Sequence, residues 1–431
     1  MTGSGLGAVF RVREFRVVWT AELLSVAGDQ LARVALAVLV YGRTGSAAWA
    51  AFTYALTFLP ALLGGVLLAG LADRYRRREV MITADLLRAV LVALMAIPQM
   101  PTWAVCAFLV VVVLLGAPHT AAQGALLPAI LRGELYERGL AVRQITTQSA
   151  QLVGFASGGL LVAAVTPSLA LLGDAATFAL SALLVRIGVA DRPRPGPVEG
   201  SEASGGGHDE VSGTGSASGS PRGVRGAIAG FTEIVTDPRR RALVVLAWLV
   251  GWYVVPEALA APYADQLGAG PAVVGLLMAA DPLGSVLGAW LFVRFVPAET
   301  RARLVGVLAA AAGLPLLLAL LHPGIALTVV LWALSGALAT AYLLQTQASF
   351  VRATPDGSRG RAIGVAASGI VAAQGLAVLV GGLLADLWDP ATAIAVAGAL
   401  GTLMSLGGAL AWHRANREPL VEAGVGATSR G

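Results

Sequence analysis

Long runs of apolar residues, broken by short polar segments, occupy almost the whole chain. A membrane-spanning helix needs about 20 mostly apolar residues. Runs of that length predict a first set of helices near 16–41, 47–71, 80–98, 102–130, 138–165 and 168–187, and a second set near 241–264, 271–295, 302–321, 324–350, 362–386 and 389–412. The pattern therefore predicts an all-α integral membrane protein with twelve transmembrane helices in two six-helix bundles.

One segment between the two sets differs in composition. Residues 191–238 start with several prolines and continue as a Gly/Ser-rich stretch, which buries too little apolar surface to fold alone. We expect a flexible cytoplasmic linker, with a short surface helix over 222–237. The predicted organisation is an N-terminal bundle (1–190), the linker (191–238), a C-terminal bundle (239–415) and a cytoplasmic tail (416–431).

Pairs of glycines recur at similar places in the predicted helices. Gly64-Gly65, Gly158-Gly159 and Gly381-Gly382 each precede a short aliphatic run. Small residues let helix backbones approach closely in lipid, and such recurrence indicates bundles built from three-helix repeats. The alternative is that glycine, with 53 copies, is simply common in this chain.

Composition excludes several classes of protein. The chain is 57% hydrophobic and 13% charged, whereas soluble domains are about 45–50% apolar and about 25% charged, so a soluble enzyme, a disordered chain and a fibrous repeat are excluded. Cys106 is the single cysteine, and the four histidines are dispersed. No metal-ligand spacing or catalytic constellation is evident, so we expect no enzyme, no metal and no cofactor.

Charge fixes the expected orientation. All 30 basic residues are arginine, and 27 of them lie in the termini and in the loops on the same side of the membrane as the termini. The positive-inside rule then places both termini and the linker in the cytoplasm and makes the protein a multi-pass plasma-membrane protein. The arginine clusters lack interleaved aromatic residues, so no nucleic-acid partner is expected.

The first predicted helix carries unusual charges. Glu22, Asp29 and Arg33 are 7 and 4 residues apart and fall on one helix face. Asp29 lies about 20 Å along the helix from Arg16, near the middle of the bilayer, where charge is costly and usually functional. One interpretation makes Asp29 a protonatable switch biased by Arg33; the other makes Asp29 and Arg33 a static pair.

The second half offers two further acids. Glu257 and Asp281 lie in apolar runs beside Pro256 and Pro282, which free backbone groups near a cavity. Either acid could bind a proton or attract a cationic substrate, and Glu257 could instead be a hydrogen-bonded group near the outer surface. We expect Asp85 to make a structural bond, with Arg88 as a candidate partner, and Asp174 to be structural too.

Neutral polar side chains complete the candidate site. Four glutamines lie within or near the predicted helices, and they suit a cavity that recognises polar parts of a mostly apolar ligand. Hydrogen bonds between helices explain them equally well. These substrate-cavity candidates are Gln148, Gln151, Gln345 and Gln374.

One loop carries a family resemblance. The segment Leu71-Ala72-Asp73-Arg74-Tyr75-Arg76-Arg77-Arg78 resembles the signature loop of the major facilitator superfamily, with Ala69 and Arg76 replacing its two glycines. Other segments resemble the enterobactin-exporter and macrolide-efflux-like branch. They are Phe15-Arg16, Gly28-Asp29, Ala84-Asp85-Leu86-Leu87-Arg88, Asp174-Ala175-Ala176-Thr177-Phe178 and Arg359-Gly360-Arg361.

The resemblance implies the major facilitator fold, alternating access and coupling to the proton gradient. It implies that Asp73, with Arg74, Arg77 and Arg78, forms a conformational latch on the cytoplasmic side; the alternative for the arginines is a purely topogenic role. The antiporter motif of the family is incomplete, because Phe155 stands where the family has proline.

The function expected from sequence is secondary active transport. We expect proton-coupled efflux of amphipathic small molecules of the drug, macrolide or siderophore type, by a monomer in the lipid bilayer. An importer or uniporter of the same fold is the alternative. A non-transporting or lipid-handling membrane protein is a third reading, against which the retained intramembrane charges argue.

Overall fold

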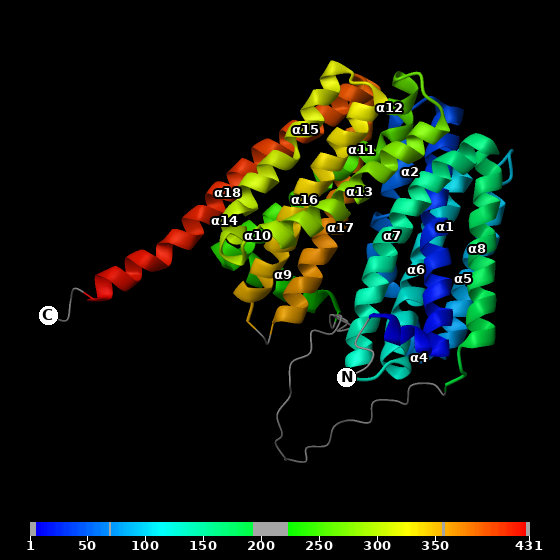
Figure 1. Ribbon diagram of the computed structural model, residues 1–431, viewed down its shortest axis with the longest axis horizontal. Helices are drawn as coiled ribbons and strands as arrows, with labels where there is room; N and C mark the ends of the chain where they lie inside the picture. The colour runs from blue at the N-terminus through cyan, green and yellow to red at the C-terminus, as the bar shows by residue number, and fades with distance from the viewer. Residues whose placement is uncertain (1–5, 69, 193–222, 356–357, 428–431) are drawn as a thin grey trace, which may run out of the picture.

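The computed structural model describes residues 6–68, 70–192, 223–355 and 358–427, and these form helices and short connections (Figure 1). The N-terminal elements are η1 (Leu6–Arg11), α1 (Arg13–Thr44), α2 (Ala47–Ala55), α3 (Leu59–Leu67), α4 (Leu71–Arg74), α5 (Arg77–Met95), α6 (Thr102–Ile130), α7 (Glu134–Ala164) and α8 (Pro167–Gly188). The C-terminal elements are α9 (Gly223–Thr236), α10 (Pro238–Trp248), η2 (Leu249–Val254), α11 (Val255–Ala258), α12 (Ala260–Gln266), α13 (Pro271–Phe295), α14 (Ala298–Ala312), α15 (Leu314–Leu317), η3 (Leu318–Leu321), α16 (Ile325–Ala353), α17 (Arg359–Leu387) and α18 (Pro390–Ala427).

Within these described residues, ten helical segments are long and apolar enough to cross a membrane. The predicted helices 80–98 and 138–165 also form, as α5 and α7, but they are not among the ten. Both helices contain charged residues, including Asp85 and Arg88 in α5 and Arg143 in α7. These charges pair inside the protein, as described below, which offsets their cost in an apolar surrounding.

Proline divides several of the predicted helices. The expected helix 241–264 is broken into α10, η2, α11 and α12, with Pro256 and Pro262 inside it. The expected helix 302–321 is interrupted before Pro315, and 47–71 is divided before Pro60. Proline lacks a backbone N–H and its ring clashes with the preceding turn, so a regular α-helix is interrupted there.

The N-terminal helices α1 to α8 lie on one side of the molecule and the C-terminal helices on the other (Figure 1). In the first group α1 packs against α7 and α8, and α5 packs against α6 and α8. In the second group α13 packs against α16, and α14 packs against α16 and α18. The two groups meet mainly where α7 contacts α13 and where α2 contacts α17.

Small residues allow these contacts between the groups. A Cβ atom added to Gly159 of α7 would lie 2.6 Å from the Cα of Gly275 in α13. A Cβ atom added to Gly382 of α17 would lie 2.4 Å from the Cβ of Ala51 in α2. Gly159 and Gly382 belong to the glycine pairs that the sequence singled out, and the structure uses them for helix packing across the molecule.

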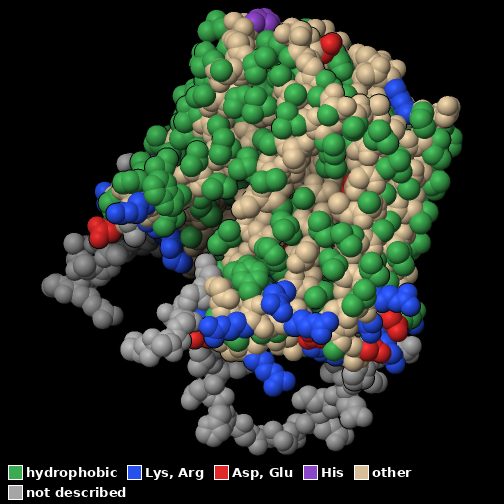
Figure 2. Space-filling view, turned by 45° about the vertical axis from the view of Figure 1, so that its right-hand side comes forward, with side chains coloured by type: hydrophobic (Ala, Val, Ile, Leu, Met, Phe, Trp, Pro, Cys, Tyr) green, Lys and Arg blue, Asp and Glu red, His purple; other side chains and the backbone are tan. Residues whose placement is uncertain are grey.

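Hydrogen bonds also join the two groups, at the end far from the N-terminus. Tyr41 donates to Oδ2 of Asp265 at 3.1 Å. Asp386 accepts from the hydroxyl of Ser46 and from the backbone N–H of Ala47, both at 2.6 Å. At the opposite end, where arginine side chains gather, the surface is hollowed between the groups (Figure 2).

The predicted linker lies largely outside the described residues, which resume at 223. The short helix expected over 222–237 is confirmed as α9, and Gly230 of α9 packs against Arg361 and Val365 of α17. The C-terminal helix α18 reaches Ala427, beyond residue 415, where the bundle was predicted to end. Most of the predicted tail is therefore a continuation of this helix.

Candidate functional site

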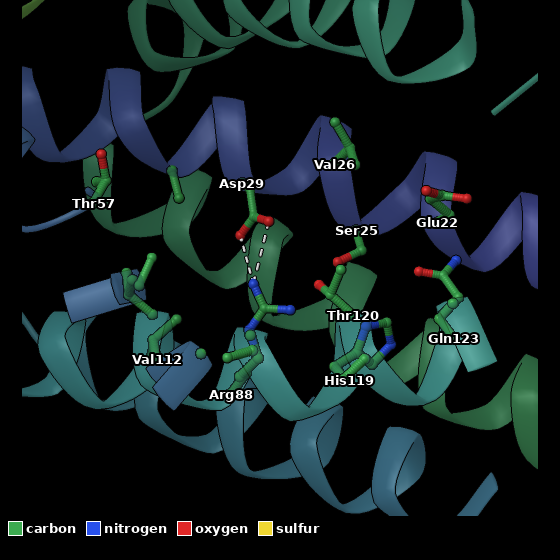
Figure 3. Close-up of a pocket in the computed structure, with 18 of the residues that line it drawn as sticks. Glu22, Ser25, Val26, Asp29, Thr57, Arg88, Val112, His119, Thr120 and Gln123 are labelled. Atoms are coloured by element: carbon green, nitrogen blue, oxygen red, sulfur yellow. Dashed lines mark hydrogen bonds and ion pairs between the residues drawn. The ribbon is translucent and has the colours of Figure 1, made fainter. Parts of the chain in front are cut away.

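A cavity of about 1220 Å³ lies among the N-terminal helices (Figure 3). Residues of α1 and of α3 to α8 line it. Its polar and charged side chains are Glu22, Ser25, Asp29, Arg33, Thr57, Arg77, Arg88, His119, Thr120, Gln123, Tyr136, Arg143 and Asp174. A cavity that holds both acids and bases among apolar membrane helices is the strongest candidate for a functional site.

Asp29 is paired with Arg88, not with Arg33. Nη2 of Arg88 lies 2.9 Å from Oδ1 and 3.2 Å from Oδ2 of Asp29 (Figure 3). The expected alternative of a static Asp29–Arg33 pair is therefore wrong. The guanidinium of Arg33 lies instead 5.8 Å from the ring centre of Tyr54 and 5.7 Å from that of Phe58.

Arg88 also faces a second acid. Its Nη1 lies 3.7 Å from Oδ1 of Asp85, one turn earlier in α5, which confirms the expected contact between these residues. The Arg88 guanidinium stacks over the ring of Phe178 in α8, with 3.9 Å between Cζ and the ring centre. Asp85 is fully buried, so its charge depends entirely on protein groups for stabilisation.

Two further side chains surround Asp85. Ser181 of α8 donates a hydrogen bond of 2.6 Å to Oδ2, and Nε2 of His119 in α6 lies 3.3 Å from the same oxygen. Asp174, buried in α8, approaches the hydroxyl of Thr177 at 3.3 Å through its Oδ1. His119 was passed over in the sequence because it is an isolated histidine in an apolar run, with no local spacing to mark it.

Glu22 has a partner of its own. Arg143 of α7 donates from Nε and Nη2 to the two carboxylate oxygens of Glu22, each at 2.7 Å. This bidentate geometry is the strongest arrangement available to an arginine and a carboxylate. Glu22 thus joins α1 to α7, on the same helix face as Asp29 but with a separate cation.

Glu257 and Asp281 form a second polar group with residues of the other half. Tyr54 of α2 donates a hydrogen bond to Oε2 of Glu257, and both side chains are buried. Tyr54 interacts electrostatically with Glu257, Arg33 and Asp281. Glu257 in turn interacts electrostatically with Arg33 and Asp281. The structure therefore brings Arg33, Glu257 and Asp281 together across the two halves.

The residues expected to form the latch are placed within the N-terminal helices. Arg77 donates to the carbonyl of Ala125 in α6 at 2.8 Å, and Arg78 donates to the carbonyl of Arg186 at the end of α8. Arg74 is exposed at the end of α4. The side chain of Asp73 lies outside the described part of the structure, so the latch stays a prediction.

The four candidate glutamines are distributed elsewhere. Although all four are described, the lining of the large cavity includes none of them and includes Gln123 instead. Gln345 is buried and donates to the hydroxyl of Ser349, one turn along α16, at 3.1 Å. Gln148, Gln151 and Gln374 are half-buried.

The chemistry available in the cavity is therefore proton and charge exchange. Asp29, Asp85 and Asp174 surround a single arginine, and His119 adjoins them. Among the described residues no group of three or more histidine, cysteine, aspartate or glutamate side chains has the arrangement of a metal site. Ion pairs of this kind can change partners when one acid gains a proton, because burial makes the charged form of each acid dependent on its partner.

Comparison with known proteins identifies the family. The family model described as Major Facilitator Superfamily matches residues 18–256 and 242–429. The macrolide efflux protein A of Streptococcus pyogenes is 28% identical over 125 residues, which are 28% of this chain and 31% of that protein. The chain thus spans about a third of the length of that curated relative in the match.

Solved structures share the fold. A nucleoside transporter matches with a TM-score of 0.71 and 12% identity, covering 93% of this chain and 99% of the other. A bacterial homologue of the human lysosomal transporter Spinster, in an inward-facing and unoccupied conformation, matches with a TM-score of 0.64, 16% identity and coverage of 93% and 95%. A bacterial homologue of the iron transporter ferroportin in an inward-facing state matches with a TM-score of 0.64 and 14% identity, covering 92% and 98%.

The family match extends over almost all of the chain, and ten apolar helices agree with it. The protein is therefore a multi-pass membrane protein, and it belongs to the Major Facilitator Superfamily.

Proposed function

We propose that this protein is a secondary active transporter that exports amphipathic small molecules in exchange for protons. The observation that carries the proposal is the cavity that Asp29, Arg88 and Asp174 line among apolar helices, with the buried Asp85 next to Arg88. Charges so placed are costly and are usually retained for transport or proton binding. The partial likeness to a macrolide efflux protein supports the direction of transport and the drug or macrolide type of substrate, with siderophores as a further class.

In this proposal α5 and α7 join the ten apolar segments to give twelve membrane helices in two bundles of six. The arginine-rich end faces the cytoplasm together with both termini, and the membrane is the plasma membrane. The hydrogen bonds Tyr41–Asp265 and Ser46–Asp386 then close the outer side. The hollow between the two groups at the arginine-rich end then makes this an inward-facing state.

Transport proceeds by alternating access of the monomer. The halves separate on the outside and approach on the inside, so the polar contacts of Asp386 and Glu257 break once in each cycle. Asp29 is the principal proton-coupling residue, with Glu22, Arg33, Glu257 and Asp281 as charged neighbours in the two halves. Asp73, Arg74, Arg77 and Arg78 latch the cytoplasmic side when it closes.

The test uses proteoliposomes with an imposed proton gradient and an internal pH-sensitive dye. Erythromycin, an iron-free catecholate siderophore and the cation ethidium are added in turn to the wild type, to Asp29→Asn and to Asp389→Asn. Asp389 is the matched control, because it caps α18 at the end of the molecule far from the cavity. Substrate-dependent proton movement that Asp29→Asn abolishes and Asp389→Asn retains is expected.

Substrate flux without any proton movement would contradict proton exchange and leave a uniporter. Flux only toward the liposome side that corresponds to the cytoplasm would instead make the protein an importer. Specific binding without flux of any compound would favour the non-transporting reading.

A further inference from the structure

Arg88 faces more negative charge than it can neutralise. Its guanidinium lies 2.9 Å from Asp29 and 3.7 Å from Asp85, and Asp174 is within electrostatic reach of both Asp29 and Arg88. Asp85 and Asp174 are 0% and 1% exposed. With three ionised carboxylates and one guanidinium the group would carry a negative excess inside a membrane protein, which is strongly unfavourable. A proton bound within this cluster would remove the excess.

His119 is placed to carry that proton. Its Nε2 lies 3.3 Å from Oδ2 of Asp85, and its side chain is among those that line the cavity (Figure 3). Neither Nε2 of His119 nor Oδ1 of Asp85 has a hydrogen-bond partner among the described residues. Imidazole is the side chain that ordinarily changes charge between about pH 5 and 8. A proton on Nε2 would give Oδ2 of Asp85 a second donor beside the hydroxyl of Ser181.

The charged groups around His119 come from every helix that contributes to this part of the cavity. Helix α5 presents Asp85, Arg88 and Arg77, α1 presents Asp29, Glu22 and Arg33, and α8 presents Asp174. Glu22 is held by Arg143 of α7 and is thus already neutralised. The remaining lining residues of α3 and α4 are Ala61, Gly65 and Ala72, which carry no charge.

We propose that His119 is the proton-carrying partner of Asp85 and that its charge decides whether Arg88 binds Asp29 or Asp85. This inference rests on the proposed function and assigns the coupling to residues beyond Asp29. When His119 is protonated it neutralises Asp85, and Arg88 stays on Asp29, as the structure shows. When His119 loses its proton, Asp85 attracts Arg88 and Asp29 becomes free.

A free Asp29 then binds the cationic group of a substrate. The proton on His119 and the organic cation on Asp29 thereby exclude each other, although they bind to different residues. The cation can bind Asp29 only after Arg88 has moved to Asp85, and a proton on His119 prevents that move. His119 and Asp85 are positioning residues in this scheme, since they act through Arg88. The substrate class that this cavity favours is an amphipathic organic cation.

The test measures binding of tetraphenylphosphonium, a permanent cation without a titratable group, to the full-length protein in detergent under weak buffering. The wild type should bind the probe more tightly at about pH 8 than at about pH 5.5, by at most tenfold per pH unit, and should release about one proton for each probe bound. His119→Gln should bind the probe equally at both pH values without proton release. Asp85→Asn should bind weakly at both, because the carboxylate that draws Arg88 away from Asp29 is then missing.

The matched control is His322→Gln, which should behave like the wild type. His322 lies in the turn after η3, and its Nε2 is 3.2 Å from Nε2 of Gln266, far from the cavity. Folding of each variant is checked by size-exclusion chromatography. A second readout needs no variant at His119. In a protein with isotope-labelled histidine, one of the four histidine NMR signals should move to the position of neutral imidazole when the probe is added at constant pH.

Proton release by His119→Gln at the wild-type level would overturn the inference, as would wild-type binding that is absent or unaffected by pH. Probe binding that survives unchanged in Asp29→Asn would instead overturn the substrate site of the proposed function. If binding needs Asp29 but proton release does not need His119, the proposed function stands and only the present inference fails.

Discussion

Tyr54 in α2 donates a hydrogen bond to the carboxylate of Glu257 in α11, and so joins a buried residue of the N-terminal helices to a buried residue of the C-terminal helices. The two side chains are 4% and 6% exposed. A buried carboxylate that loses its donor is left without compensation for its lost hydration. When the two halves separate at the Tyr54–Glu257 hydrogen bond, Glu257 must therefore gain a new hydrogen-bond partner, contact water or bind a proton.

Replacing Tyr54 by Phe should favour the state that is open at the outer end. Loss of a hydrogen bond to a charged group costs about 1.5–3 kcal/mol, which shifts a two-state population by about 10–100-fold. Spin labels on Gln99→Cys and Leu321→Cys, which are exposed in outer turns of the two halves, report the change. The distance distribution between the labels should gain a longer component.

The matched control for this experiment is Tyr253→Phe. Tyr253 is also buried, but its hydroxyl donates to the carbonyl of Ala309 within the C-terminal helices, at 2.6 Å. This variant should be less stable without lengthening the label distance. An unchanged distribution in Tyr54→Phe would mean that the hydrogen bond to Glu257 does not hold the halves together.

Asp386 should contribute to closure at the outer end as well. Its carboxylate lies at the N-terminus of α2 and accepts from Ser46 and Ala47 across the molecule. An anion at a helix N-terminus contributes about 0.3–1 kcal/mol, beyond the hydrogen bonds themselves. Asp386→Ala should therefore lengthen the same label distance.

Asp389→Ala is the control for Asp386. Asp389 accepts hydrogen bonds from Thr392 and Gln266, which both belong to the C-terminal helices. Its loss should lower the melting temperature and leave the label distance unchanged. Equal distance changes in both variants would show that the effect of Asp386 is general destabilisation.

Gly28 is where α1 packs most closely on α8. A Cβ atom there would lie 2.3 Å from both Oδ1 of Asp174 and Oγ1 of Thr177. Gly28→Ala should destabilise the protein by about 1–3 kcal/mol, as overpacking usually does. Gly42→Ala in the same helix is the control, since nothing lies within 4 Å of its Cβ position. Thermal unfolding in detergent measures the melting temperatures of the two variants. Equal melting temperatures would contradict the packing argument.

The Glu22–Arg143 pair should be structural and should behave as one unit. The two side chains are only 11% and 17% exposed, so Glu22→Gln alone leaves a poorly hydrated arginine and should cost about 3 kcal/mol. The double variant Glu22→Gln/Arg143→Gln should recover much of this loss. Melting temperatures of the four proteins of this double-mutant cycle give the coupling, and additive losses would show that the two residues act independently.

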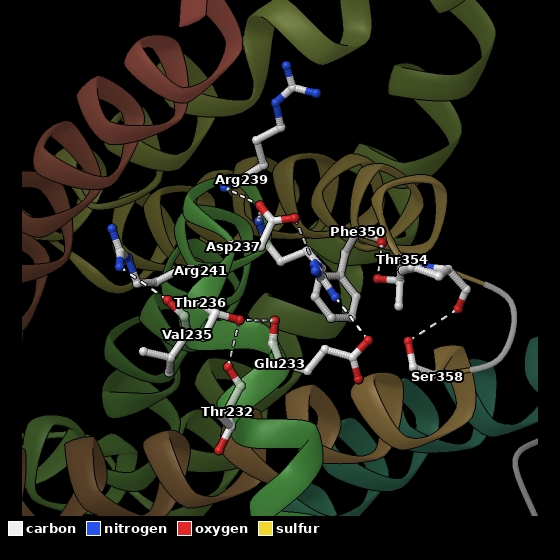
Figure 4. Close-up of polar contacts among 12 residues, drawn as sticks. Thr232, Glu233, Val235, Thr236, Asp237, Arg239, Arg241, Phe350, Thr354 and Ser358 are labelled. Carbon is white, nitrogen blue, oxygen red and sulfur yellow. Dashed lines mark hydrogen bonds and ion pairs between the residues drawn. The ribbon is translucent and has the colours of Figure 1, made fainter. Parts of the chain in front are cut away.

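Asp237 should make stability depend on pH at the start of α10 (Figure 4). Burial raises the pKa of Asp237, but hydrogen bonds from the Arg240 side chain and from the N–H groups of Arg239 and Arg240 outweigh it, so the pKa lies below its ordinary value. A lowered pKa adds stability above the unfolded pKa of about 3.9, and this stability is lost as the pH falls through the folded value.

Asp237→Asn keeps the cap and removes the charge. It should cost about 0.5 kcal/mol at neutral pH, and the difference from the wild type should shrink as the pH falls below about 4. Melting temperatures at neutral and acidic pH measure this difference. A difference that is the same at both pH values would mean that the charge contributes no stability.

The helices could be predicted from sequence because their lengths are set by the bilayer and their ends by local residues. The prediction 102–130 coincides with α6, which follows Pro101 and is followed by Gly133 with a positive φ of 55°. The interruptions in the predicted helix 241–264 could be suspected from Pro256, but not their extent. Three separate helical segments and a 3-10 turn there reflect tertiary packing that no local pattern records.

The partners of the charged residues could not be predicted. Spacing along α1 made Arg33 the natural partner of Asp29, because both lie on one helix face. The actual partner, Arg88, is 59 residues away and reaches Asp29 because α5 and α1 both pack on α8. His119 became recognisable only when the structure placed it beside Asp85, since His119 has no motif of its own.

The glycine contact between α7 and α13 has a mechanical consequence. Gly159 and Gly275 touch near the end of α7 that is far from Glu134, and neither residue has a side chain to hold the two backbones apart. From Gly159 to the start of α7 at Glu134 the helix rises about 37 Å. A rotation of about 10° around this point would carry that end of α7 through an arc of about 6 Å. A small change of angle at the contact between Gly159 and Gly275 is therefore enough to move the opposite end of α7 widely.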